Sequence, residues 1–101
     1  MESDANEFSG FEWDADKSDA TLLTRGLDFA AAAMVFEGDY MEREDLRQEY
    51  GERRFVVTGE VAGVVVTLVW TPRGPLRRII AAWPASNRER RVFREHRPVH
   101  E

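Results

Sequence analysis

The chain has 101 residues, of which 43% are hydrophobic and 11% aromatic, so it fits one folded domain and is not a disordered segment. It has no cysteine, which excludes a disulfide framework and thiolate metal sites, and its net charge of −5 does not by itself indicate a nucleic-acid partner. The apolar run at residues 64–70 is too short to cross a bilayer and residues 1–10 lack a signal-peptide pattern, so we expect a cytoplasmic protein that does not bind a membrane.

The charge is distributed unevenly along the sequence. Residues 1–51 carry 4 basic and 14 acidic side chains, a balance of −10, whereas residues 52–101 carry 10 basic and 5 acidic ones, a balance of +5. The second half alone therefore has the charge of a nucleic-acid-binding segment, and a fold that separates the halves would present an acidic and a basic face.

The domain is expected to span residues 11–97, with a flexible leader at residues 1–10 and a tail at residues 98–101. The apolar residues 11–13 predict an edge strand. Asp14 or Asp16 then suits the N-cap of a helix over about 15–25, which would stop at Gly26 because glycine readily takes the left-handed conformation.

A second helix is predicted from the spacing of apolar residues along one helical face, with Asp28 at its start and its end near residues 36–38. That face is made of Leu27, Ala30, Ala31, Met34 and Val35. Residues 39–51 are densely charged. Their pattern is compatible with a weak helix or with a solvated surface connection, and the connection is favoured.

The pattern changes to β from residue 53 onward. Residues 55–60, 64–71 and 76–82 are rich in β-branched or aliphatic residues and are separated by turn sequences, so they predict a three-stranded antiparallel meander that Pro84 closes. Ser86 and Glu89 then form a capping box for a last helix that runs to about residue 97. The order of elements predicts an α+β domain.

Five short motifs occur in order between residues 11 and 93. They are Phe11-Glu12-Trp13-Asp14-Ala15-Asp16-Lys17; Gly26 followed by Phe29, Ala32, Val35 and Phe36; Gly51-Glu52-Arg53-Arg54; Arg78-Ile79-Ile80-Ala81-Ala82; and Glu89-Arg90. Together they resemble the BrnT family of bacterial toxins. The resemblance implies a RelE-like fold, toxic cleavage of RNA without a metal or other cofactor, and inhibition by a BrnA-like antitoxin that carries a ribbon-helix-helix DNA-binding region.

The resemblance also implies which residues act. Glu52, Arg54 and Arg78 match family positions and are the candidate catalytic residues, because a carboxylate can move a proton and guanidinium groups can hold a phosphate. The alternative interpretation of Glu52 and Arg54 is a surface ion pair without a catalytic role. Four further residues are candidates for binding the RNA substrate: Arg25, Trp83, Arg90 and Arg94. The favoured alternatives are a solvated basic face for Arg90 and Arg94 and a core or interface position for Trp83.

Four positions depart from the family pattern. Thr24-Arg25 replaces a Lys-His pair, Trp83 replaces an arginine, and Phe93 replaces a tyrosine. These substitutions leave a second hypothesis open, a catalytically weakened module that holds its antitoxin and tunes operon repression, with operator DNA contacted only through the antitoxin. His96 and His100 have a spacing typical of metal ligands, but Pro98 lies between them and no metal site is expected.

Overall fold

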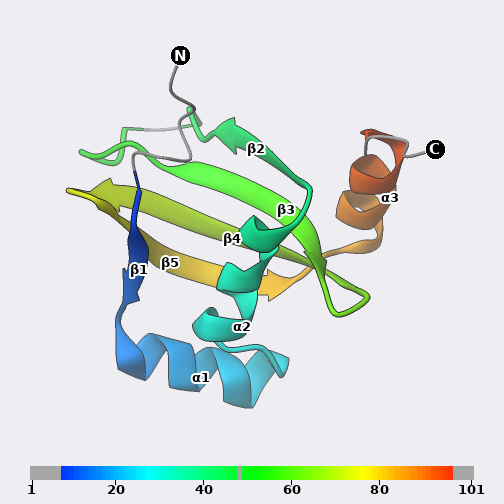
Figure 1. Cartoon of the computed structure of the whole chain (residues 1–101), viewed down its shortest axis with the longest axis horizontal. Helices are drawn as coiled ribbons and strands as arrows, with labels where there is room; N and C mark the ends of the chain where they lie inside the picture. The colour runs from blue at the N-terminus through cyan, green and yellow to red at the C-terminus, as the bar shows by residue number, and fades with distance from the viewer. Residues whose placement is uncertain (1–7, 48, 97–101) are drawn as a thin grey trace.

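The computed structural model describes residues 8–47 and 49–96, which form a mixed α+β fold around one five-stranded sheet (Figure 1). The strand order is β1-β5-β4-β3-β2. In chain order the elements are β1 (Gly10–Trp13), α1 (Ala15–Arg25), α2 (Phe29–Ala33), the 3-10 helix η2 (Met34–Glu37), β2 (Tyr40–Glu44), β3 (Phe55–Val61), β4 (Val64–Arg73), β5 (Leu76–Pro84) and α3 (Asn87–His96). The predicted α+β class is confirmed.

The sheet has one strand, β2, in addition to the predicted edge strand and three-stranded meander, and its overall strand order is not a simple meander. Successive strands from β2 to β5 pair antiparallel, whereas β1 pairs parallel with β5, with Trp13 opposite Ile79. A parallel pair requires a long crossover connection, and here everything from α1 to β4 lies between the two paired strands. The first and last strands of the chain are therefore neighbours, and β1 is an edge strand as predicted.

The expectation of a helix or surface connection for residues 39–51 is wrong over its first part, because Tyr40–Glu44 is the strand β2 at the other edge. Side chains alternate along this strand, so Glu42 and Glu44 lie on the same face of the sheet. Glu42 accepts a hydrogen bond from the indole nitrogen of Trp70 at 2.7 Å, and Glu44 forms an ion pair with Arg53 at 3.0 Å. Pairing with β3 and these contacts outweigh the low strand propensity of charged residues.

The two N-terminal helices are defined by their caps. Asp14 caps α1 by accepting from the backbone N–H groups of Asp16 and Lys17, and Gly26 ends the helix with φ of 71°, both as predicted. Asp28 caps the second helix, which is shorter than predicted because the backbone tightens into η2 after Ala33. Part of the expected leader belongs to the fold, since Phe8 packs edge-on against Trp70 at 5.1 Å between ring centroids. Residues 1–7 and 98–101 lie outside the described residues.

The main core lies between the sheet and the layer of α1 and α2. It consists of buried residues from α2, η2 and the three longest strands: Phe29, Ala32, Ala33, Val35, Val57, Val66, Leu68, Trp70, Ile79 and Ala82. Arg77 is nine-tenths buried beside this core and its guanidinium lies over the rings of Phe8, Phe36 and Trp70. Within the described part of the chain, none of the helices has the length and apolar character needed to cross a membrane.

The opposite face of the sheet, which we call the open face, is covered only in part. Helix α3 packs against one end of it through Phe93, which forms a small second core with Val65 and Ala85 (Figure 1). The predicted capping box starts this helix, since Glu89 N–H donates to the Ser86 hydroxyl at 3.1 Å and Ser86 N–H donates to the Glu89 carboxylate at 2.8 Å. Arg97, the predicted end of the helix, is outside the described residues.

Candidate functional site

Four side chains form a row across the open face, beyond the part that α3 covers. Thr71 lies opposite Arg78 in the β4–β5 ladder, and Arg78 lies opposite Glu12 in the β1–β5 ladder. Arg54 extends the row on the side of Thr71. Phe55 pairs with Trp70, so the preceding residue Arg54 lies beside Thr71. The Arg54 carbonyl accepts from Asp45 N–H at 2.8 Å, which continues the sheet by one residue. Since side chains alternate along a strand and Trp70 belongs to the main core, its neighbour Thr71 and this row face the other way.

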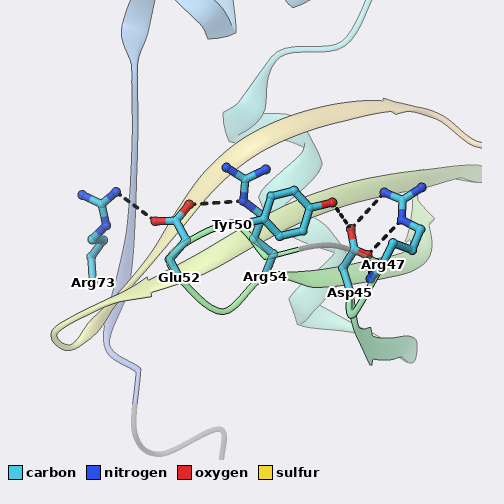
Figure 2. Close-up of polar contacts among 6 residues, drawn as sticks. All are labelled: Asp45, Arg47, Tyr50, Glu52, Arg54 and Arg73. Atoms are coloured by element: carbon cyan, nitrogen blue, oxygen red, sulfur yellow. Dashed lines mark hydrogen bonds and ion pairs between the residues drawn. The ribbon is translucent and has the colours of Figure 1, made fainter.

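Glu52 joins this row through two arginines (Figure 2). Its Oε2 accepts from Arg54 Nε at 3.2 Å, and its Oε1 accepts from Arg73 Nη2 at 3.5 Å, a weaker contact. Glu52 and Arg54 are each a little under one-third exposed, and Arg73 is about half exposed. The carboxylate is therefore held between two guanidinium groups and stays accessible to solvent.

Sequence reasoning missed Arg73. It lies two residues after Thr71 in β4, and the alternation of side chains along a strand places it on the same face. The predicted strand ended at residue 71 and placed Arg73 in a turn, so no signal in the sequence assigned it to this face.

A second group of side chains supports Arg54 from the loop after β2. The Arg54 guanidinium carbon lies 4.1 Å from the ring centroid of Tyr50, and the Tyr50 hydroxyl donates to Asp45 Oδ2 at 3.1 Å (Figure 2). Arg47 donates to both oxygens of Asp45 at 2.9 Å. The hydrogen bonds from Arg47 hold the pKa of the nearly buried Asp45 carboxyl well below its usual range. Asp45 thus fixes the tyrosine that stacks on Arg54.

Arg78 is on the same face but does not contact Glu52 directly. Its Nη1 donates to Glu12 Oε2 at 2.9 Å, and both side chains are about one-third exposed. Between Arg54 and Arg78, the Thr71 hydroxyl is buried and has no hydrogen-bond partner among the described residues. The structure therefore gathers Glu52, Arg54 and Arg78 on one face. With their partners Arg73 and Glu12 they form a cluster of three arginines and two glutamates, which has an excess of one positive charge.

The four predicted substrate-binding residues lie elsewhere. Arg25 is exposed in the last turn of α1. The indole nitrogen of Trp83 donates to Glu89 at 3.1 Å, and the Arg90 guanidinium donates to the Ala85 carbonyl at 2.9 Å and to the Asn87 side chain, so both are tied to the start of α3. Arg94 is exposed on α3. No hydrogen bond or ion pair found within residues 8–47 and 49–96 connects any of the four to Glu52.

The departures from the family pattern also have structural roles. Phe93 is 2% exposed within the second core, and the Thr24 hydroxyl donates to the Ala20 carbonyl within α1 at 2.9 Å. At these two positions the chain therefore offers no free polar group to the open face.

Comparison with known proteins gives one match to a family. The family model described as "Ribonuclease toxin, BrnT, of type II toxin-antitoxin system" matches residues 13–89, which is well over half of the chain. No curated protein matches the chain. The matched segment includes Glu52, Arg54 and Arg78, and it confirms the family resemblance seen in the sequence motifs.

Proposed function

The chain belongs to the BrnT family of ribonuclease toxins of type II toxin–antitoxin systems, and from this premise we propose that it is a metal-independent endoribonuclease. Its substrate is messenger RNA, cut in the cytoplasm either free or on the ribosome, so that translation stops. The arrangement of helices on a five-stranded sheet, antiparallel from β2 to β5, supports a RelE-like fold as part of this proposal.

The proposed reaction is an internal transfer of the phosphodiester. The ribose 2′-oxygen attacks the phosphorus, its proton passes to Glu52, and the bond from phosphorus to the 5′-oxygen breaks to leave a cyclic phosphate. The 5′-oxygen takes a proton from Glu52 or from water, which reaches the exposed side of the site. Arg54 and Arg78 hold the non-bridging oxygens and stabilise the charge that develops on them.

The observation that carries this proposal is the 3.2 Å contact between Glu52 and Arg54, on the same sheet face as Arg78. Arg78 is paired with Glu12, but this pair is partly exposed. Such pairs contribute about 0–1 kcal/mol, so a phosphate can displace Glu12 at little cost. Arg54 is already oriented by Tyr50, which reduces the loss of side-chain entropy on binding.

We propose a BrnA-like antitoxin with a ribbon-helix-helix region as the partner. Membership of a toxin–antitoxin family supports an antitoxin in general, and the excess positive charge of the site suits an inhibitor that brings acidic side chains. Operator DNA would be contacted only through the antitoxin.

A second candidate function is a binding module without ribonuclease activity. The observation that favours it is that every candidate catalytic side chain already has an ion-pair partner, while Phe93 is buried and the Trp83 indole is bonded to Glu89. Such a protein would hold the antitoxin and tune repression without cutting RNA.

Induction of the chain alone in a bacterial host separates the two functions. A ribonuclease arrests growth and fragments transcripts, and Glu52→Gln abolishes both effects while antitoxin binding persists. Unimpaired growth with intact transcripts, at a verified level of folded protein, would overturn the ribonuclease proposal and leave the binding module.

A further inference from the structure

A groove of about 410 Å³ lies on the open face between α3 and the strands β2 and β3. Its apolar wall is formed by Met41, Val56 and Val92, and Arg43 and Arg88 line it with their charged side chains. The volume is in the range of pockets that hold a single small-molecule group. No residue of this groove other than those of the capping box was singled out in the sequence.

The groove continues directly from the cluster around Arg54. Val56 is two residues after Arg54, and Arg43 lies opposite Val56 in the β2–β3 ladder. Two residues along a strand cover about 6.6 Å, so the groove begins one row of side chains away from the Arg54–Thr71–Arg78 row. A single strand that places one phosphate on Arg54 would bring a neighbouring nucleotide to the groove.

The carboxylates that line the groove are already engaged, whereas the arginines are not. Glu89 Oε1 accepts hydrogen bonds from Ser86 N–H, the Trp83 indole and the Thr67 hydroxyl at 2.8, 3.1 and 3.3 Å. Arg43 and Arg88 are exposed, and neither forms an ion pair within the part of the chain that the structure describes. The charges of Glu42, which accepts from the Trp70 indole at 2.7 Å, and Glu89 balance those of Arg43 and Arg88. The two guanidinium groups can still donate hydrogen bonds, so the groove suits an occupant with an apolar body and a phosphate.

We propose that this groove is a nucleotide subsite, which seats the base beside the scissile phosphate against Val56 and Val92 and places an adjoining phosphate between Arg43 and Arg88. The inference rests on the proposed function, because it assigns the neighbouring part of the same RNA substrate. Size and continuity favour a nucleotide over an acidic protein segment, since a specific protein interface covers about 800 Å² on each partner and would not be confined to one groove. Contact through aliphatic side chains predicts weak discrimination among bases.

Binding of a fully 2′-O-methylated oligoribonucleotide tests the subsite, because its capped 2′-oxygens cannot attack the phosphorus. In fluorescence anisotropy, the double variant Arg43→Gln/Arg88→Gln should bind at least ten-fold more weakly than the wild type. Its salt slope should fall by about 0.7, because the variant loses the contact with one phosphate on a single strand. The matched control is Arg91→Gln, an exposed arginine of α3 that does not line the groove and should change affinity less than two-fold.

Methyl NMR locates the base. The methyl signals of Val56 and Val92 should shift when the methylated oligonucleotide is added, whereas those of Val64, an exposed residue outside the groove, should not. Unshifted Val56 and Val92 signals at saturating oligonucleotide would overturn the subsite.

Cleavage by the wild type separates failure of the subsite from failure of the proposed function. If the wild type cuts RNA and the double variant has an unchanged KM and oligonucleotide affinity, only the subsite is wrong. If the wild type binds the oligonucleotide through both arginines but cuts nothing, the subsite stands and the ribonuclease fails. If the wild type does not bind the oligonucleotide, the subsite is overturned. It is also overturned if the double variant no longer binds the antitoxin but binds RNA with unchanged affinity.

Discussion

Thr71 lies directly opposite Arg78 in the ladder between β4 and β5, and the Thr71 hydroxyl is buried without a hydrogen-bond partner among the described residues. An unpaired buried hydroxyl costs about 1–3 kcal/mol, and its replacement by an apolar group of the same shape removes that cost. The buried Thr71 hydroxyl therefore lowers the free energy of unfolding relative to an apolar side chain of the same shape at this position.

Thr71→Val should leave the free energy of unfolding unchanged or raise it by about 1 kcal/mol, because valine matches the shape of threonine and lacks the hydroxyl. Urea unfolding measures this. The control is Thr67→Val, since the Thr67 hydroxyl is bonded to Thr58 and Glu89 and its loss should destabilise the fold by about 1 kcal/mol. A loss of more than 1 kcal/mol in Thr71→Val would show that the hydroxyl is satisfied in solution.

Glu52→Gln should lower kcat/KM for RNA cleavage by roughly 10²-fold or more, the size of a lost general base. Steady-state cleavage of a defined RNA measures it. Glu44→Gln is the matched control, because Glu44 is also ion-paired with an arginine, but its partner is Arg53 and not Arg54 or Arg73. Equal losses in both variants would indicate a general effect of charge and argue against a role of Glu52 in the chemistry.

Asp45 should make stability depend on pH on the acid side. Its pKa is lowered in the folded protein, so its contribution is complete above the unfolded pKa of about 3.9 and is lost as the pH falls through the lower folded pKa. Asp45→Asn should therefore have a lower Tm than the wild type at pH 7, and the difference should shrink progressively below pH 4. Thermal unfolding at several pH values checks this, and a difference that stays constant down to pH 2 would refute it.

Gly26→Ala should destabilise the protein by about 1 kcal/mol, because φ of 71° is a left-handed conformation that alanine adopts only with strain. Gly38→Ala is the control. Both glycines have open space where a Cβ would lie, but Gly38 has φ of −128°, which any residue adopts. Denaturant unfolding should show a loss for Gly26→Ala and none for Gly38→Ala, and equal effects would mean that backbone conformation does not explain the difference.

Local signals in the sequence were sufficient for much of the fold. The N-cap at Asp14, the stop at Gly26 and the capping box of Ser86 and Glu89 each depend on neighbours within four residues, and all three are present. The strand β2 could not be predicted in this way, because Tyr40–Glu44 is charged and is held in the sheet by β3, Trp70 and Arg53, which are distant in sequence.

In the candidate site, too, only contacts between residues close in sequence could be predicted. Glu52 and Arg54 are two residues apart, and their contact follows from local geometry. Arg73 reaches Glu52 from 21 positions away, and Glu12 reaches Arg78 from 66, so neither pairing could be read without knowledge of strand register. The support of Arg54 by Tyr50 and Asp45 depends on the course of a loop that carries no periodic pattern.

The parallel pairing of β1 with β5 has a consequence for the order in which the chain becomes active. Residues 10–13 find their partner only at residues 76–79, so the site row from Arg54 to Glu12 is incomplete until the strand carrying Arg78 has been synthesised and has left the ribosome. Ribosomes add about 5–20 residues each second, so a partly made chain spends seconds without a finished site. A chain built in this way therefore has no complete row of site residues before Arg78 has been made and has paired with Glu12.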